Sequence, residues 1–524
     1  MTRFFKFLSK ENSIQGASLI LIVTLTLSNI LGLIRDRFLT KNIDTFNLDI
    51  YYAAFRVPDL IFNFLILGAI TSAFIPVFSD FIAQKKEKEG FLVTNELINI
   101  AVILMIACAA ILFFLMPYVV PLIVPSFDSF RMGETIKISR MLMITPVFFA
   151  MSYILGGVLN SYKRFFVYSL SPLFYNLSII IGAAVFGPKY GITGVVYFVI
   201  IGAFLHFLVQ LPTVIKLGYR FKAIISFKDP AIRRIIRLMI PRTIGMGASQ
   251  IMLLVYTAIA SALAAGSITA FNLANNIQTV PIVILGTSFA TAIFPTLAAK
   301  ISEGKETEFS FYLNRALRAI GFLLIPASII FILLRAHIVR LILGSGKFGW
   351  DDTKMTALAL GFFSLSILAQ GLIPLLSRAF YALKNTRTPM YIGIASVIFS
   401  VIIAYPLAKE LSVAGLALAF SIGSYFNAFV LFYYLRKKYP KILDKGLVGS
   451  YAKTLTISII MGGITWAALH FLAGYVDMSR FFGVLTQAAA SFAIGAISFL
   501  GLSYLFDHDE MRWAFTRKIN NDAK

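Results

Sequence analysis

The chain has 524 residues, of which 59% are hydrophobic and 14% are charged, and its mean hydropathy is +0.84. A soluble domain cannot bury this much apolar surface, so the composition excludes a soluble globular protein and indicates many membrane spans. The single cysteine, Cys108, lies inside an apolar run, which excludes a disulfide framework and a cysteine-based metal site.

Fourteen apolar stretches are long enough for a helix across a hydrocarbon core of about 30 Å. A β-barrel would need alternating segments of about ten residues, and all-apolar runs such as 97–115 contradict it. We therefore predict an all-α polytopic membrane protein. The stretches are 18–39, 51–78, 98–120, 138–159, 165–186, 192–211, 235–262, 268–297, 311–334, 355–379, 390–407, 413–435, 455–472 and 485–505.

The net charge of +23 is unevenly placed along the chain. Roughly two thirds of the 47 lysines and arginines lie in the N-terminal segment, the even-numbered loops and the C-terminal segment. This bias predicts that both termini are cytoplasmic, and it favours anionic membrane lipids rather than nucleic acid as partners of the basic surface. The first residues, MTRFFKFLSKENSIQ, read as an amphipathic lead-in, and no small-residue cleavage site follows them, so we predict no removable signal peptide.

Two segments recur about 220 residues apart. Gly187–Gly202 (GPKYGITGVVYFVIIG) is echoed by Ala408–Gly423 (AKELSVAGLALAFSIG), and Ser72–Pro76 (SAFIP) by Thr291–Pro295 (TAIFP). Duplicated lobes are typical of alternating-access transporters. We predict two pseudo-symmetric six-helix lobes and two extra C-terminal helices, which are either a lipid-facing accessory or a mere anchor. The predicted parts are a lead-in at 1–17, an N-lobe at 18–220, a C-lobe at 221–438, accessory helices at 439–506 and a cytoplasmic tail at 507–524.

Ionisable residues gather near one end of the first helical hairpin. Arg35 and Asp36 come late in the first span, and Asp49 and Arg56 begin the second. Buried intramembrane charges are costly, and an arginine offers a planar fork of donors that suits phosphate or carboxylate. The four residues predict a cradle for an anionic head group, with a structural ion-pair network or interfacial snorkelling as the alternative. For the neighbouring Arg37 and Asp59 we favour that structural alternative.

The second lobe carries few charges within its spans. No Asp or Glu occurs in 241–300 or 355–408, so a cation-coupled exporter would lack a carboxylate there. Arg242 either faces the cavity or snorkels to the cytoplasmic surface. The amides of Asn272, Asn275, Asn276 and Gln278 serve either the cavity or interhelical hydrogen bonding. No catalytic, nucleotide-binding or metal-binding motif is present, so we expect a transporter without cofactor or metal rather than an enzyme.

Several motifs together resemble one family. SNILGLIRDRF, LDIYYAAFRVPDLIFNFLILGAITSAFIPVFSDF, LNSYKRFF, TAIFPTLA and SRAFYALKNTRTP are similar to segments of the MurJ/MviN lipid II flippase family, within the multidrug/oligosaccharidyl-lipid/polysaccharide exporter superfamily. The resemblance implies fourteen inner-membrane helices that move undecaprenyl-diphosphate-linked peptidoglycan precursor outward, with the polyprenyl tail in a groove along helices 13 and 14. It also implies cell-wall synthesis proteins as partners.

By position, the resemblance assigns substrate binding to Arg35, Asp36, Asp49 and Arg56. The chain departs from the family where a cavity arginine is usual at Asn29, and again at Phe62 and Asn276. The acidic EGA segment of the family reads LGA at 67–69, which removes another cavity charge. The carboxylates proposed to bind sodium in some members fall at Tyr256 and Ala404, which speaks against sodium coupling through that site. The candidate substrate-binding residues are Arg35, Asp36, Asp49, Arg56, Asn29, Asn276 and Arg242.

Three alternatives stay open at this point. A sibling exporter would move another polyprenyl-linked saccharide. A cation-coupled drug antiporter fits less well, because the second lobe lacks intramembrane carboxylates. A membrane-embedded enzyme such as a glycosyltransferase fits least, because no catalytic constellation is visible.

Overall fold

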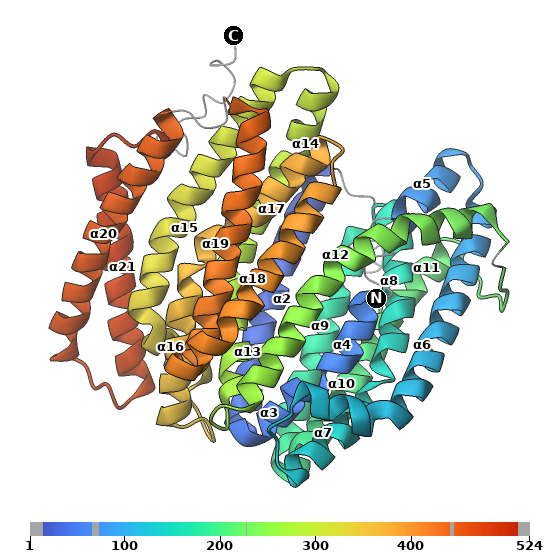
Figure 1. Ribbon diagram of the computed structural model, residues 1–524, viewed down its shortest axis with the longest axis horizontal. Helices are drawn as coiled ribbons and strands as arrows, with labels where there is room; N and C mark the ends of the chain where they lie inside the picture. Colours follow the sequence, from blue (N-terminus) through green and yellow to red (C-terminus); the bar gives the residue numbers. More distant parts are fainter. Residues whose placement is uncertain (1–13, 65–72, 227, 441–444, 512–524) are drawn as a thin grey trace. The chain divides into compact units, whose positions relative to one another are not determined.

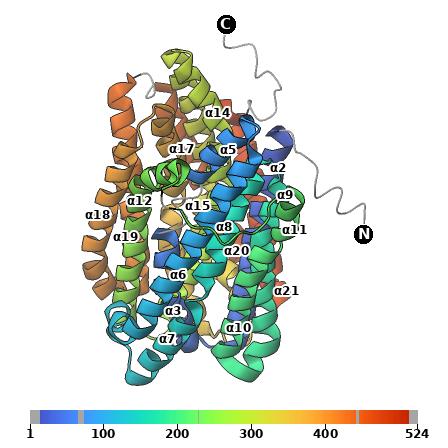
Figure 2. The ribbon, with the colours of Figure 1, turned by 90° about the vertical axis from the view of Figure 1, so that its right-hand side faces the viewer.

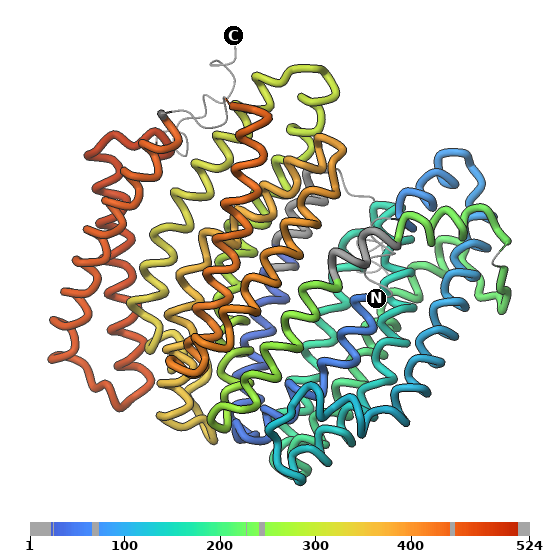
Figure 3. The backbone as a smooth tube through the Cα atoms, viewed as in Figure 1, coloured from blue at the N-terminus to red at the C-terminus, as the bar shows by residue number. Residues whose placement is uncertain are grey.

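The structure, a computed structural model, describes residues 14–64, 73–226, 228–440 and 445–511, with only the backbone described at 14–22, 25, 240–246 and 445 (Figure 3). By packing, the chain forms two compact units, one of residues 1–269 with 345–348 and one of residues 270–344 with 349–524. Of the predicted lead-in at 1–17, residues 1–13 lie outside the described residues. The predicted boundary between lobes at 220/221 is a boundary of the sequence repeat and stays a prediction.

The first unit is helical throughout the part that is described (Figure 1). Its helices are α2 (Ile14–Asn42), α3 (Thr45–Ala54), α4 (Arg56–Phe62), α5 (Ile75–Ala83), α6 (Glu87–Ile123), α7 (Ser129–Leu142), α8 (Thr145–Ser161), α9 (Phe165–Ile181), the π-helix η3 (Gly182–Phe186), α10 (Gly187–Leu208), α11 (Leu211–Lys216) and α12 (Pro230–Ser261). Aspartates begin three of them: Asp44, Asp128 and Asp229 each accept hydrogen bonds from backbone N–H groups of the first turn of α3, α7 and α12.

The second unit continues the same architecture. Its helices are α13 (Ser267–Pro281, which begins in the first unit), the π-helix η4 (Ile282–Thr287), α14 (Ser288–Ser302), α15 (Glu306–Leu343), α16 (Trp350–Leu365), α17 (Ile367–Ala382), α18 (Arg387–Leu411), α19 (Val413–Lys438), α20 (Lys445–Ala473) and α21 (Phe481–Leu505). The helix α15 packs against α14, α16, α17, α20 and α21, and Figure 1 shows the last two side by side next to it. In the first unit, α8 packs against both α6 and α10, and Figure 2 shows these three running side by side.

Among the described residues, nine helical stretches are long and apolar enough to cross a membrane, or ten if the pair α16 and α17, bent by 44°, is one span. Three of the fourteen predicted spans contain residues that are not fully described, namely those in α2, in 45–83 and in α12. Two more are joined in the 52-residue stretch Phe165–Lys216, which is broken at Gly191. The all-helical polytopic membrane fold predicted from the sequence is confirmed.

The two units repeat each other's backbone conformation at the spacing of the sequence repeat. Gly191 has φ 59° and ψ −147°, and Ser412, 221 residues later, has φ 55° and ψ −140°. Lys163 and Lys384 likewise share a positive φ, of 56° and 58°. A non-glycine residue rarely adopts such a φ, so a chance match at two corresponding positions is implausible. The duplication read from the sequence is therefore present in the local structure of both units.

The predicted polar tail begins with buried residues. His508 is 1% exposed and Glu510 is 4% exposed, so the first part of this segment packs against the second unit, and residues 512–524 lie outside those described.

Candidate functional site

Arg35 and Asp36 form an ion pair on α2, within the first span that the sequence predicts. Two guanidinium nitrogens of Arg35, Nε and Nη2, donate to Asp36 Oδ1 at 3.0 and 2.8 Å, and Nη1 donates to Asn176 Oδ1 on α9 at 3.1 Å. Asp36 is 1% exposed, whereas the side chain of Arg35 is 22% exposed. The buried carboxylate therefore holds the guanidinium in place while part of the fork stays accessible to a ligand. Sequence reasoning missed Asn176, although an amide inside an apolar span is a signal for it.

Aromatic side chains surround this ion pair. The rings of Tyr51 and Tyr52 lie 5.4 Å apart, edge to face, and both tyrosines interact electrostatically with Arg35. The hydroxyl of Tyr52 is buried and has no hydrogen-bond partner within the described part of the chain. A buried hydroxyl without a partner is costly, so it is available to a ligand.

Arg56 lies where the chain bends from α3 into α4. Its Nε donates to Thr257 Oγ1 on α12 at 2.8 Å, and the hydroxyl of Thr257 in turn donates to the Leu253 carbonyl. The neutral partner leaves the charge of Arg56 uncancelled at this contact. Asp59, three residues later, also acts electrostatically on Arg56. Arg35 and Arg56 both belong to the first unit.

Asp49 is engaged in a way that sequence reasoning did not anticipate. The residue is 2% exposed, and its carboxylate accepts hydrogen bonds from Gly266 N–H at 2.6 Å, Thr269 N–H at 2.8 Å and Thr269 Oγ1 at 2.7 Å. Both acceptor oxygens therefore serve the amino end of α13, where unpaired N–H groups and the helix dipole favour a negative charge. Asp49 caps α13 from another helix, and its predicted contact with a substrate stays a prediction.

The three remaining candidates differ in what the structure describes. Asn29 is half-buried on α2, and Asn276 is half-buried on α13 in the second unit. The side chain of Arg242 lies outside the described residues. Close to Asn276, Gln278 is fully buried and accepts a hydrogen bond from Ser366 Oγ at 3.1 Å, which shows that part of this amide run serves interhelical bonding.

Arg378 on α17 is an intramembrane cation that the sequence analysis overlooked. It is half-buried, and its Nη1 lies 3.4 Å from the carbonyl oxygen of Thr287, the last residue of η4. A π-helix displaces backbone hydrogen bonds and recurs at functional sites. Gly286 allows the close approach of η4 to α17, because a Cβ there would lie 2.7 Å from the Cα of Gly371. The signal in the sequence was a lone arginine in an apolar span.

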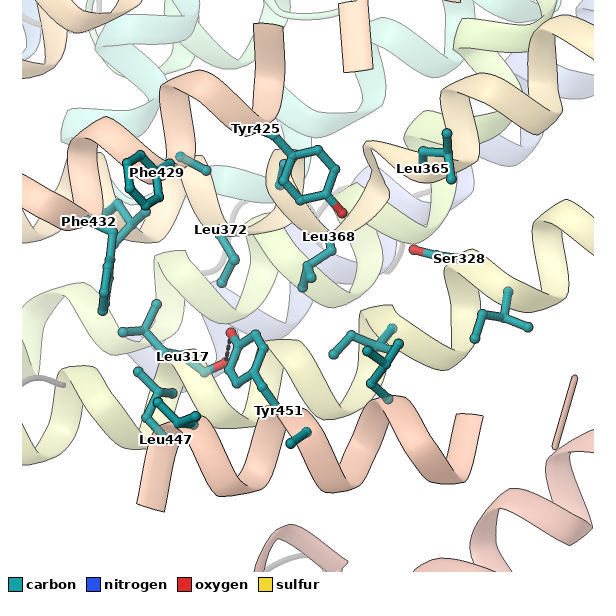
Figure 4. Close-up of a pocket in the computed structure, with 18 of the residues that line it drawn as sticks. Leu317, Ser328, Leu365, Leu368, Leu372, Tyr425, Phe429, Phe432, Leu447 and Tyr451 are labelled. Atoms are coloured by element: carbon teal, nitrogen blue, oxygen red, sulfur yellow. Dashed lines mark hydrogen bonds between the residues drawn. The ribbon is translucent and has the colours of Figure 1, made fainter. Parts of the chain in front are cut away.

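An apolar groove with a volume of about 690 Å³ lies within the second unit, among α15, α17, α19 and α20 (Figure 4). Figure 4 shows Tyr425 and Phe429 from α19 on one side and Tyr451 from α20 on the other. The hydroxyl of Tyr451 donates to the Leu317 carbonyl at 2.9 Å, and Ser328 Oγ donates to the Leu324 carbonyl. With these groups already bonded, the groove suits a long apolar chain. Other lining residues are Ile325, Ile329, Leu365, Leu368, Leu372, Phe432, Leu447 and Val448.

The chemistry available at these places is binding rather than bond making. Across the described residues, no three side chains of His, Cys, Asp or Glu gather as a set of metal ligands. The intramembrane arginines offer charge-assisted hydrogen bonds to an anion, and the groove offers apolar contact.

Comparison with known proteins agrees with this arrangement. A model of the family described as lipid II flippase MurJ matches residues 44–486. A probable lipid II flippase MurJ of Rickettsia prowazekii is 27% identical over 497 residues, which cover 93% of this chain and 97% of that protein. A lipid II flippase MurJ of Burkholderia cenocepacia is 26% identical over 459 residues, which cover 85% of this chain and 88% of that protein. A solved lipid II flippase MurJ in an inward closed conformation has a TM-score of 0.78 and 25% identity, with 94% of this chain and 99% of that one covered.

A more distant likeness of fold extends to a multidrug transporter. An inward-facing multidrug resistance MATE transporter of the MOP superfamily has a TM-score of 0.71 at 13% identity, with 79% of this chain and 95% of that chain covered, which shows a shared fold. The family model covers most of the chain, and its members are transporters rather than enzymes. The chain belongs to the lipid II flippase MurJ family.

Proposed function

We propose that this protein flips lipid II, moving the undecaprenyl-diphosphate-linked peptidoglycan precursor from the inner to the outer leaflet by alternating access. The observation that carries the proposal is a family match over residues 44–486 together with intramembrane arginines and an apolar groove on the same chain. A lipid-linked diphosphate needs both a cationic partner for its head group and an apolar surface for its tail.

Arg35 and Arg56 are the proposed partners of the diphosphate. Asp36 fixes the orientation of Arg35, so that the exposed part of its fork faces a ligand without first losing side-chain entropy, and Thr257 fixes the orientation of Arg56. The hydroxyl of Tyr52 adds a neutral donor beside Arg35. Asp49 acts through α13, whose amino end it caps. Asn29, Asn276 and Arg242 are proposed as further substrate-binding residues, by their positions in the family resemblance.

The apolar groove of the second unit is the proposed binding site of the polyprenyl tail. Two of its walls are α15 and α20, and α20 is one of the two helices that lie outside the sequence repeat. A tail lying there stays in apolar surroundings while its head group crosses the membrane. Within the second unit, Arg378 is a further intramembrane cation, and the group that its Nη1 contacts, the Thr287 carbonyl, is neutral.

The protein is proposed to lie in the bacterial cytoplasmic membrane with both termini in the cytoplasm. The support is the bias of lysine and arginine toward the termini and the even-numbered loops, which the positive-inside rule links to the cytoplasmic side. The same basic loops would face anionic lipids, and cell-wall synthesis proteins are the proposed protein partners.

The experiment that tests the proposal follows labelled lipid II across vesicles containing the purified protein. Arg35→Ala removes a charge-assisted hydrogen bond worth about 1.5–3 kcal/mol, so the transport rate should fall about tenfold to a hundredfold, with Arg35→Lys in between. Arg234→Ala is the matched control, because that arginine is exposed and pairs with Asp80 outside the spans. Equal rates in the wild type and Arg35→Ala would refute the electrostatic part of the proposal.

A further inference from the structure

Residues 507–511, which follow the last membrane helix, fold back against the second unit. His508 Nε2 lies 2.9 Å from Thr454 Oγ1 on α20, and the ring of His508 lies 5.0 Å from the ring of Phe322 on α15. Met511 packs against the hydrophobic cluster that α15, α20 and α21 share. This short segment therefore contacts both α15 and α20, although most of its side chains are polar.

One oxygen atom of this segment joins the two helices. Glu510 Oε1 accepts a hydrogen bond from Arg318 Nε on α15 at 2.5 Å and another from Ser450 Oγ on α20 at 2.8 Å. Arg318 Nη2 also donates to Asp509 Oδ2 at 2.6 Å, and Glu510 Oε2 faces His508 Nδ1. The side chains of Glu510 and Arg318 are 2% and 12% exposed, so water hardly competes with these bonds.

The residues that Glu510 joins are sequence neighbours of two residues of the groove. Arg318 follows Leu317, and Ser450 precedes Tyr451, whose hydroxyl donates to the Leu317 carbonyl across the same pair of helices (Figure 4). The helices are very close here, because a Cβ on Gly321 would lie 2.7 Å from the ring of Tyr451. The hydrogen bonds of Glu510 thus act at the end of the groove where two of its walls meet.

We propose that Glu510 is a positioning residue that sets the spacing of α15 and α20 and thereby the fit of the apolar groove to a long lipid tail. This inference rests on the proposed function, because it requires that the lipid tail binds in the groove. Burying an ion pair contributes little net stability compared with apolar packing. What the buried carboxylate does supply is a fixed geometry, since its two donors come from two different helices.

The test measures how a lipid tail binds in the groove. A photoreactive phenylalanine analogue replaces Phe429, which lines the groove and is 70% exposed. The full-length protein is mixed with radiolabelled polyprenyl-diphosphate disaccharide carrying either a long or a short tail, and the apparent Kd is taken from the crosslinking yield. The variants are Glu510→Ala, which removes the acceptor, and Glu510→Gln, which keeps an oxygen for Arg318 and Ser450. Asp351→Ala, which removes a carboxylate 97% exposed on α16, is the control.

A positioning role predicts a change that depends on tail length. Losing contact to about two methylene groups weakens binding of the long-tailed lipid about tenfold in Glu510→Ala, with the short-tailed lipid unchanged. Glu510→Gln should restore long-tail binding to within about threefold of the wild type, and Asp351→Ala should bind as the wild type does. General unfolding would instead weaken the binding of both lipids and would not spare the glutamine variant.

Two failures can be told apart. If the wild type gives no crosslink to the long-tailed lipid, the tail does not bind in the groove. Both the assignment of the groove and the positioning role of Glu510 are then refuted. If the wild type crosslinks and Glu510→Ala binds each of the two lipids as tightly as the wild type does, the groove assignment stands and the positioning role is refuted.

Spin labels at Phe311 on α15 and Thr456 on α20, with Cys108→Ser, give a second readout. Their distance distribution should broaden in Glu510→Ala, and an unchanged distribution would contradict the proposal.

Discussion

Replacing Asp49 by asparagine should lower the free energy of unfolding. The loss comes from the cap of α13 and not from a contact with substrate. The carboxylate accepts bonds of 2.6, 2.7 and 2.8 Å from Gly266 and Thr269 with both of its oxygens. Asparagine keeps one acceptor and places a donor where the other oxygen was, so at least one buried N–H loses its partner, at about 1–3 kcal/mol. Loss of the charge at the amino end of α13 adds about 0.3–2 kcal/mol. We expect a total of about 1–5 kcal/mol.

The assay is chemical unfolding of the purified protein in detergent, followed by lipid II transport at a temperature where the variant is folded. Asp44→Asn is the matched control, because Asp44 caps α3 within its own helix and asparagine caps almost as well there. The control should lose less than about 0.5 kcal/mol. The reasoning fails if Asp49→Asn is as stable as the wild type but transports nothing, because Asp49 would then act on the substrate and not on α13.

Three further outcomes follow from the structure. Ser412→Gly should stabilise the protein by about 1–2 kcal/mol in the same unfolding assay, because φ is 55° there, whereas Gly191→Ala at the corresponding turn should destabilise it. Burial opposes ionisation of Glu510, but hydrogen bonds such as that from Arg318 lower its pKa from 4.5 to about 2. The stability advantage over Glu510→Gln should therefore be full above pH 4.5, decline below it and be lost by about pH 2. Arg378→Ala should slow lipid II transport about tenfold without lowering the melting temperature.

The sequence was sufficient to predict the membrane fold and the duplication. Apolar stretches of about twenty residues leave few alternatives to helices, because lipid cannot satisfy backbone hydrogen bonds. The repeat was visible partly because Gly194 and Gly415 occupy matching positions, where a Cβ would press on the backbone of residues 186 and 407. The π-helix η4 was not foreseen, since its residues IVILGT have no pattern that separates them from an α-helix.

The candidate site was predictable in composition but not in its partners. An arginine beside an aspartate in an apolar span marks Arg35 and Asp36, and the structure shows their ion pair. No local pattern connects Asp49 to Gly266 and Thr269, which lie more than two hundred residues away and meet it only through the tertiary fold. Glu510 likewise falls within the predicted cytoplasmic tail, because a polar segment after the last span gives no sign that it bonds to Arg318 and Ser450 in a buried place.

The most direct test of the lipid II assignment depletes the endogenous MurJ of a tester bacterium, expresses this chain and measures the appearance of labelled lipid II at the outer leaflet. The account predicts that this chain restores outward lipid II and growth, and that Arg35→Ala inserts into the membrane normally but does not restore either. Normal insertion of the wild-type chain without any outward lipid II would contradict the assignment and would favour an exporter of another polyprenyl-linked saccharide.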